Sequence, residues 1–151
     1  MKGKVVAVCI SDRKGVPKKE IPAGRLIAGH GLEGDAHAGA WHRQVSLLAL
    51  ESIEKMQALG LKVKPGSFAE NITTAGIELT ALPVGTRLKV GKEVLLEVSQ
   101  IGKECHTRCA IYYQAGDCVM PRKGIFARVL QGGTVRPGDE IEVLPAEEEG
   151  K

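Results

Sequence analysis

Aromatic side chains are scarce in this chain of 151 residues, where they make up only 3% of the total. The basic residues are dispersed along the sequence, and the formal net charge is no more than +3. Proteins that bind single-stranded nucleic acid typically combine clustered basic residues with stacking aromatic rings. We therefore expect no nucleic acid among the partners of this protein.

Long apolar runs are also lacking. No run approaches the roughly 20 residues that a membrane-spanning helix needs. The first residues, Met1–Lys4, lead into a strand-like stretch at Val5–Val8, which is too short for the apolar part of a secretory signal. We therefore expect a cytoplasmic protein that makes no membrane contact.

The length of the chain fits a single domain. A domain of about 150 residues can bury roughly two-thirds of the surface that its unfolded chain exposes. Hydrophobic residues at 43% and charged residues at 26% are ordinary for a globular protein. We predict one domain over residues 1–145, followed by a frayed acidic tail over residues 146–151.

Strand patterns dominate the sequence. Lys4–Ile10 and Val94–Ile101 are rich in Val, Ile and Leu and are bounded by turn residues, which predicts two strands. Gly85–Val90 and Gly138–Val143 each combine a glycine turn with alternating polar and apolar residues. Gly91–Lys92 is a predicted hairpin tip. The sequence therefore predicts a mainly β fold, either a β-meander or a barrel.

Helical patterns are rare. Apolar residues recur at helical spacing over Leu50–Leu59, which predicts a helix with Gly60 as its C-cap. A second short helix is predicted over Thr107–Gln114. We therefore expect one or two short helices beside the sheet.

One short segment, Gly29–Arg43, gathers four glycines, three of the four histidines and the only tryptophan. Glycine allows close backbone approach to a ligand, and the polar side chains supply donors and acceptors, so the segment is a predicted binding loop. Gly29, Gly31 and Gly34 also match G-x-G-x-x-G. The buried strand before the turn and the helix after it, which dinucleotide binding requires, are both missing, so we reject that interpretation.

The cysteines are of two kinds. Cys9 lies in an apolar strand and is most simply a small buried hydrophobic residue. Cys105, Cys109 and Cys118 lie close together late in the chain. Basic and ionisable residues flank Cys105 on both sides within residues 103–108 and favour its thiolate, which attacks electrophiles and binds soft metals. Cys105 is therefore a candidate reactive or metal-ligating cysteine.

Structural explanations compete with that interpretation. A disulfide is disfavoured in the cytosol. A closed zinc site could use Cys105, His106 or Cys109 with Cys118, although the spacing lacks the C-x2-C pair of common structural sites. An iron–sulfur cluster would need a fourth ligand. Inert burial of all three cysteines is the remaining alternative.

Several blocks in the right order resemble the MOSC family, the domain also found at the C-terminus of molybdenum cofactor sulfurases. These blocks span nearly the whole chain: Gly34–His37, Arg43–Leu48, Pro65–Ile72, Cys105, Gly124–Gly133 and Pro137–Asp139.

The resemblance implies a compact β-barrel-like fold, molybdenum cofactor binding, and sulfur carried or transferred by one cysteine. Cys105 matches that cysteine by position, as a molybdenum ligand or as the carrier of a persulfide. Two blocks depart from the family pattern. Gly102–Cys105 replaces the usual Arg-x-Pro-Cys, and Ala69 stands where the family usually has the glycine of Phe-Gly-Glu-Asn. The departures suggest a sub-branch of small stand-alone proteins.

A pterin–dithiolene cofactor carries a phosphate and a soft-ligand metal, so cations and N–H donors suit one end and a thiolate the other. For Glu70 and Asn71 the alternative role is turn capping, for His37 it is a satisfied half-buried histidine, and Asp35 and Asp139 would stabilise turns. The predicted cofactor-binding residues are Gly34, Asp35, His37, Arg43, Glu70, Asn71 and Arg108.

The sequence therefore predicts a molybdenum cofactor-binding or sulfur-carrier protein with Cys105 at its centre. The chain has no room for a pyridoxal phosphate domain, so sulfur would come from a donor protein of the cysteine desulfurase type, or the partners would be molybdenum cofactor biosynthesis proteins. One alternative is a molybdenum-dependent reductase of N-hydroxylated substrates, which would need an electron donor. The other is a non-catalytic, zinc-stabilised β-barrel interaction module with Cys109 and Cys118 as zinc ligands.

Overall fold

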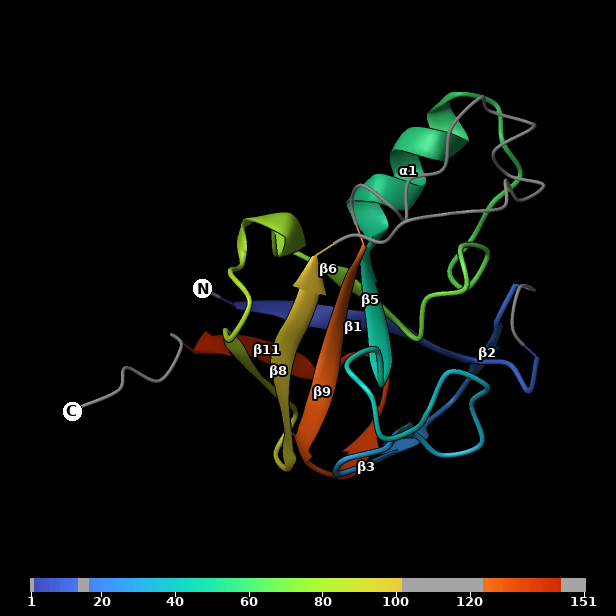
Figure 1. Cartoon of the computed structure of the whole chain (residues 1–151). Coiled ribbons are helices and arrows are strands. Elements are labelled where there is room, and N and C mark those ends of the chain that lie inside the picture. Colours follow the sequence, from blue (N-terminus) through green and yellow to red (C-terminus); the bar gives the residue numbers. More distant parts are fainter. Residues whose placement is uncertain (1, 14–16, 102–123, 145–151) are drawn as a thin grey trace.

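The structure is a computed structural model that describes residues 2–13, 17–101 and 124–144 (Figure 1). Strands predominate, and the one α-helix, α1, spans Leu50–Ala58, with a short 3-10 helix, η1, at Leu79–Ala81. The predicted mainly β fold is confirmed. The strands are β1 (Lys2–Ile10), β2 (Lys19–Ile21), β3 (Gly24–Ile27), β4 (Gly31–Leu32), β5 (Val45–Ala49), β6 (Ile72–Ala75), β7 (Arg87–Val90), β8 (Val94–Ile101), β9 (Ile125–Gln131), β10 (Gly133–Val135) and β11 (Glu140–Leu144).

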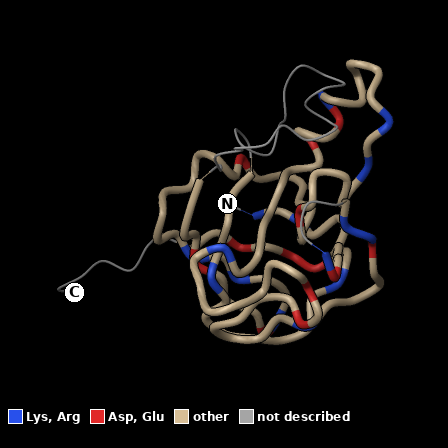
Figure 2. Tube along the Cα trace, turned by 45° about the vertical axis from the view of Figure 1, so that its right-hand side comes forward, with Lys and Arg blue, Asp and Glu red and all other residues tan. Residues whose placement is uncertain are grey.

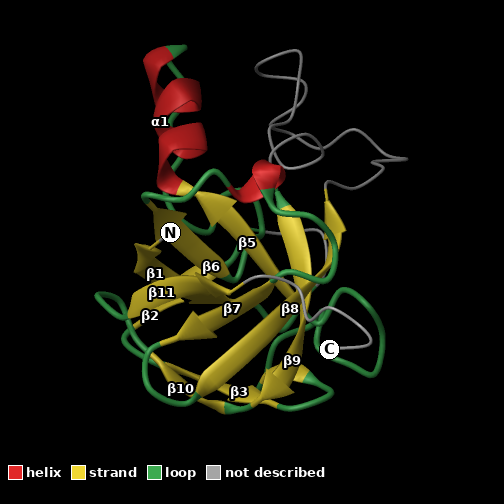
Figure 3. Cartoon of the chain, turned by 90° about the vertical axis from the view of Figure 1, so that its left-hand side faces the viewer, coloured by secondary structure: helices red, strands yellow, loops and turns green. Residues whose placement is uncertain are grey.

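Seven strands form a closed barrel in the order β11-β7-β8-β9-β5-β6-β1, and pairing between β11 and β1 closes it (Figure 3). Neighbouring strands run antiparallel except β5 and β6, where Leu47 lies opposite Ile72 in a parallel pair. The connection between these two strands contains α1. Closure leaves no open edge in the barrel, which is the usual way for an all-β domain to satisfy its backbone groups.

Two smaller pieces attach to the barrel. Strand β2 pairs with the end of β1, where Val8 lies opposite Ile21. A three-stranded sheet in the order β10-β3-β4 lies beside the barrel (Figure 1). The loop between β4 and β5 contains residues 33–44 and emerges from this small sheet.

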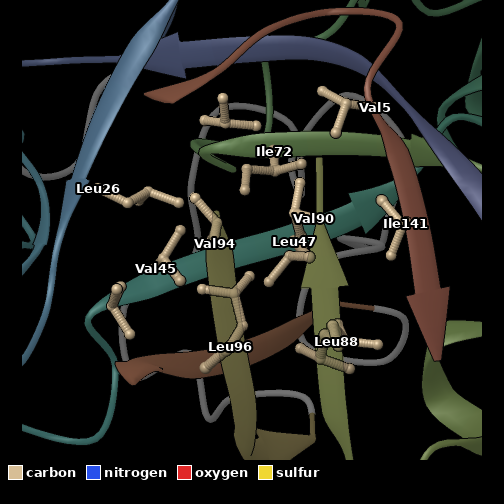
Figure 4. Packing of buried hydrophobic residues seen from close by; sticks show 14 of the residues in the cluster. Val5, Leu26, Val45, Leu47, Ile72, Leu88, Val90, Val94, Leu96 and Ile141 are labelled. Atoms are coloured by element: carbon tan, nitrogen blue, oxygen red, sulfur yellow. The ribbon is translucent and has the colours of Figure 1, made fainter. Parts of the chain in front are cut away.

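The barrel is filled by side chains that alternate along the strands. In β8, Val94, Leu96 and Val98 are fully or almost fully buried, whereas Leu95 and Glu97 between them are only half-buried. Figure 4 shows such side chains from several strands converging on one interior. The period of two follows from strand geometry, so the alternating pattern of the sequence fixes which face points inward.

A second apolar cluster lies outside the barrel. Helix α1 contributes Ile53 and Met56, and the sheet contributes Leu48 of β5 and Phe126 of β9. Leu48 and Phe126 follow inward-facing residues in their strands, so they point to the opposite face. Packing against this face holds α1 and the loop after it, residues 59–71, on the barrel.

Most element predictions are confirmed. The predicted strand at Val94–Ile101 is β8, the predicted strand at Lys4–Ile10 extends to Lys2 in β1, and Gly91 forms a hairpin tip with φ 61°. The predicted helix begins at Leu50 and ends at Ala58. The C-cap is Leu59, so the predicted C-cap at Gly60 was wrong by one position. Gly60 follows the cap with φ 93°.

The glycines of the G-x-G-x-x-G match do not lie between a strand and a helix. Gly29 lies in the tight connection between the antiparallel strands β3 and β4, Gly31 is the first residue of β4, and Gly34 lies in the loop after it. The predicted helix at Thr107–Gln114 and the predicted acidic tail over residues 146–151 lie outside the described residues.

Charged residues of both signs are interspersed along the trace, as Figure 2 shows. Within the described ranges, no helix combines the length and the apolar character needed to cross a membrane.

Candidate functional site

A buried ion pair lies at the base of the loop between β4 and β5. Lys18 Nζ is 2.8 Å from Asp35 Oδ1, and both side chains have no exposed surface. The backbone N–H of Ser11 also donates to Oδ1, at 3.1 Å. Burial raises the pKa of Asp35, but the hydrogen bonds from Lys18 and Ser11 outweigh it, and the net pKa is lowered. Asp35 is therefore an ionised carboxylate that anchors the loop.

His37 completes this cluster. Its Nδ1 lies 2.9 Å from Lys18 Nζ, and its backbone N–H donates to Asp35 Oδ2 at 3.1 Å. The side chain of His37 is 28% exposed, so its ring connects a buried pair to the surface. We call Lys18, Asp35 and His37 the Lys–Asp–His cluster. The structure thus brings together the predicted site residues Asp35 and His37, and adds Lys18.

Gly34 supplies the turn that places Asp35. It has φ 85°, in the left-handed region that glycine tolerates best. The turn is closed by the Asp35 N–H, which donates to the carbonyl of Leu32 at 3.0 Å. The predicted role of Gly34 in ligand binding stays a prediction, while its role in the turn is visible.

Arg43 lies at the other end of the same loop. Its Nε donates to Gln100 Oε1 at 3.0 Å, and its guanidinium lies 5.2 Å from the centre of the Phe126 ring and 5.9 Å from that of Trp41. His42 Nε2 contacts the same Gln100 oxygen at 2.8 Å. Among the described residues, no carboxylate lies within salt-bridge distance of Arg43. Within the described ranges, the contacts of its guanidinium are an amide oxygen and two aromatic rings.

A β-bulge in β8 positions the partners of this arginine. The pairing of β8 with β9 shifts between Val98 and Gln100, so Ser99 is the extra residue. Ser99 Oγ donates to the carbonyl of His42, and Gln100 receives the hydrogen bond from Arg43. The bulge therefore turns two consecutive polar side chains toward the loop.

Glu70 is fully buried in the loop that leads into β6. Thr73 Oγ1 donates to its Oε2 at 2.8 Å, while Oε1 has no partner with hydrogen-bond geometry among the described residues. Burial raises the pKa of Glu70, although the backbone N–H groups of Gly66, Phe68 and Glu70 itself face the carboxyl and lower it in part. The loop that leads into β6 therefore folds around the carboxyl group of Glu70.

Asn71 ties three parts of the chain together. Its Oδ1 accepts from the Ser46 N–H at 3.0 Å and from Ser46 Oγ at 3.2 Å, and its Nδ2 donates to the carbonyl of Cys9 at 3.2 Å. Asn71 is fully buried. Cofactor binding by Glu70 and Asn71 stays a prediction, whereas their contacts inside the protein form a structural framework behind the Lys–Asp–His cluster.

Cys9 has no exposed surface, which confirms the prediction of a buried cysteine. Burial raises its pKa to about 12, with further increases from Glu70 and Glu20 that outweigh the opposing effect of Lys18 and Lys64. Cys9 is therefore a protonated thiol at neutral pH, unsuited to nucleophilic chemistry.

The family of the chain follows from comparison with known proteins. The family model of the MOSC domain matches residues 34–142. The chain belongs to the MOSC domain family. The matched region contains the Arg43 contact with Gln100 and the buried Glu70 and Asn71, together with Asp35 and His37. Lys18 precedes the matched region in the sequence, and the fold brings it next to Asp35.

Solved structures confirm the MOSC fold. YuaD from Bacillus subtilis superposes with a TM-score of 0.80 at 22% identity, covering 97% of this chain and 98% of that chain. YiiM from Geobacillus stearothermophilus gives a TM-score of 0.70 at 19% identity, with 94% of this chain and 75% of that chain covered. YiiM from Escherichia coli gives 0.69 at 20% identity, with coverage of 99% and 72%. No curated protein matches the sequence.

The departure of this MOSC domain from the family at Ala69 has a visible consequence. Ala69 has φ 63°, and among the described residues it is the one position where a non-glycine residue adopts positive φ. Only glycine occupies this conformation without a steric cost, so an alanine is strained at this position.

The predicted residues Cys105, Arg108, Cys109 and Cys118 lie outside the described residues. Cys105 follows Ile101, the last residue of β8, by four positions in the sequence. In the part of the MOSC domain that the structure describes, no group of three or more His, Cys, Asp or Glu side chains could hold a metal ion.

Sequence reasoning missed Lys18 and Gln100. Lys18 is the first of three consecutive charged residues, Lys18-Lys19-Glu20, and such a segment is typical of an exposed surface. Gln100 depends on the bulge, which has no local signature in β8. The sequence signal for Lys18 was indirect: a buried aspartate in the loop requires a cationic partner from elsewhere in the chain.

Proposed function

We propose that this MOSC domain binds molybdenum cofactor, or carries sulfur for it, with Cys105 as the molybdenum ligand or persulfide carrier. The observation that carries the proposal is Arg43, a guanidinium without a carboxylate partner among the described residues, held beside Gln100 near the end of β8. Cys105 follows the last residue of β8 by four positions in the sequence. We further propose a cytoplasmic location.

The residues present fit the cofactor. The half-buried Arg43 is oriented through its Nε, and its two terminal amino groups have no hydrogen-bond partner among the described residues, so they suit a bidentate interaction with a phosphate. Aromatic contacts from Trp41 and Phe126 hold the plane of the guanidinium without neutralising its charge. When bound, the cofactor would supply a redox-active molybdenum centre. Arg43 would bind and orient its phosphate.

In the sulfur-carrier form of the proposal, Cys105 accepts sulfane sulfur from a persulfide on a donor protein. The Cys105 thiolate attacks the terminal sulfur, one S–S bond breaks as another forms, and the donor leaves as a thiolate. No net oxidation or reduction occurs. The donor is a protein of the cysteine desulfurase type, or the protein acts with molybdenum cofactor biosynthesis proteins.

The proposal is tested by metal analysis of freshly purified protein, together with intact mass under non-reducing conditions. We expect molybdenum in the wild type, or a mass gain of one sulfur atom, and the loss of both in Cys105→Ala. Cys9→Ala is the matched control and should keep the loading, because the buried Cys9 thiol stays protonated.

Equal loading in wild type and Cys105→Ala would overturn the role of Cys105. Stoichiometric zinc without molybdenum or added sulfur would overturn the function itself and support the zinc-stabilised module, whose ligands would include Cys109 and Cys118.

A further inference from the structure

Two adjacent residues of the bulge in β8, Ser99 and Gln100, hold two adjacent residues of the loop before β5, His42 and Arg43. Ser99 Oγ donates to the backbone carbonyl of His42. Gln100 Oε1 lies 2.8 Å from His42 Nε2 and 3.0 Å from Arg43 Nε. Three hydrogen bonds therefore join the two pairs of residues, and they fix one backbone group and both side chains of the loop pair.

The donors determine how the Gln100 amide is oriented. Arginine Nε carries a proton and cannot accept, so the Gln100 atom that it contacts is the carbonyl oxygen. This oxygen carries no proton and only accepts, so His42 Nε2, which contacts it as well, must also donate. One neutral acceptor thus serves an arginine and a histidine at the same time.

A neutral acceptor orients Arg43 without cancelling its charge. A carboxylate at the same position would form a charge-assisted hydrogen bond, which is about twice as strong, but it would also neutralise the guanidinium. Among the described residues, no carboxylate lies within salt-bridge distance of Arg43. The rings of Phe126 and Trp41, whose centres lie 5.2 and 5.9 Å from the guanidinium carbon, attract a cation without carrying a formal charge. The described contacts of Arg43 therefore preserve its positive charge.

This arrangement has an energetic cost that an anion would offset. Arg43 is half-buried, so part of its hydration is lost, and a charge that is removed from water is costly until it is paired. Its terminal amino groups have no hydrogen-bond partner among the described residues. A guanidinium presents these groups as a planar fork that matches two oxygens of a phosphate. The unpaired charge thus favours an anionic ligand over a neutral one.

We propose that Gln100 is a positioning and specificity-determining residue of the Arg43 site. Its amide oxygen orients the guanidinium toward a phosphate group of the ligand, and the neutrality of the amide keeps the site positive. For the ligand class, the inference rests on the proposed function. For the orientation of Arg43, it rests on the hydrogen bonds from the bulge in β8.

The proposal is tested by titrating the 15N-labelled full chain with inorganic phosphate and following the Nε–H signal of Arg43 by NMR, with Arg43→Lys to assign it. We expect the signal to shift on binding in the wild type. In Gln100→Glu, the carboxylate keeps an acceptor but pairs with Arg43, so the dissociation constant should rise about tenfold or more. In Gln100→Met, which removes the acceptor and adds no charge, the rise should be smaller, about fivefold, because only the orientation of Arg43 is lost.

The same signal separates orientation from charge. In Gln100→Glu the Arg43 Nε–H should remain protected from exchange with water, since its acceptor is still present, although phosphate binds poorly. In Gln100→Met the protection should be lost. A purely structural role of Gln100 would not weaken phosphate binding in a folded variant that still holds Arg43. Gln131→Glu is the matched control, because it makes the same substitution at an exposed residue at the far end of β9 from Phe126, and it should bind phosphate as the wild type does.

Unaltered phosphate affinity in folded Gln100→Glu would overturn the proposal, and so would a larger loss in Gln100→Met than in Gln100→Glu. If Gln100→Glu does not fold, Gln100→Asn takes its place. The shorter amide would not reach Arg43, so an affinity equal to that of the wild type would overturn the positioning role. Absence of any phosphate shift in the wild type would overturn the ligand class.

Backbone amide signals from β5 and β9 show whether each variant is folded. The phosphate titration needs neither Cys105 nor molybdenum. The inference and the loading test of the proposed function can therefore fail independently of each other.

Discussion

At the scale of single residues, Ala69 is the one non-glycine residue with a positive φ in the part of this MOSC domain that the structure describes. Ala69 has φ 63°, in the left-handed region where a Cβ atom crowds the following carbonyl. The position precedes Glu70, whose carboxyl is enclosed by the backbone of the same loop. The loop imposes this conformation, and alanine pays a steric cost for it.

We predict that Ala69→Gly stabilises the protein by about 0.5–1 kcal/mol, because relief of the left-handed alanine exceeds the added entropy of the unfolded chain. Urea unfolding measures the change. Ala75→Gly is the matched control, since Ala75 is also half-buried but lies in β6 with an ordinary φ, and this change should destabilise. A loss of stability in Ala69→Gly would contradict the prediction.

At the scale of elements, the hairpin of β3 and β4 contains two glycines of positive φ with different surroundings. Gly29 has φ 71° and no heavy atom within 4 Å of the position that a Cβ would take. At Gly31, with φ 122°, a Cβ would overlap the carbonyl oxygen of Gln44. The side-chain Oε1 of Gln44 accepts from the Val129 N–H at 2.9 Å, which ties the residue before β5 to β9.

Gly31→Ala should therefore destabilise the protein by about 3 kcal/mol or more, because backbone must move where the loop between β4 and β5 joins the barrel. Gly29→Ala should cost only about 1 kcal/mol, the steric cost of the left-handed conformation. Thermal and urea unfolding of both variants would check this difference. Equal losses would show that close approach to Gln44 is unimportant.

The elements also show how far the sequence could predict the structure. Alternation predicted β8, and helical spacing predicted α1, because burial on one face leaves a periodic pattern in the chain. Lys18 and Gln100 were not predicted. Lys18 meets Asp35 only because β1 and the loop before β2 place it there, and Gln100 meets Arg43 only because of a bulge. Such contacts depend on the assembled sheet, so local patterns do not contain them.

At the scale of the whole molecule, the shifted pKa values of two buried carboxyl groups change the free energy of unfolding with pH in opposite directions. The pKa of Asp35 is lowered below its ordinary value of 3.8, so its contribution is present above that pH and is lost as the pH falls toward the folded pKa. The pKa of Glu70 is raised above its ordinary value of 4.5. Between 4.5 and the raised value, the unfolded chain releases this proton while the folded protein keeps it. The free energy of unfolding therefore falls as the pH rises through that range.

Glu70→Gln should remove this second effect. The free energy of unfolding of the variant, minus that of the wild type, should become more positive as the pH rises from 4.5 toward the raised pKa of Glu70, because the amide has no proton to release. Its absolute value also depends on how the amide fits the backbone N–H groups of the loop, so the informative quantity is the change with pH. Glu54→Gln, on the exposed side of α1, is the control for loss of a carboxylate. Urea unfolding across this range would decide the matter, since a difference that stays constant with pH would mean that Glu70 is ionised in the folded protein despite its burial.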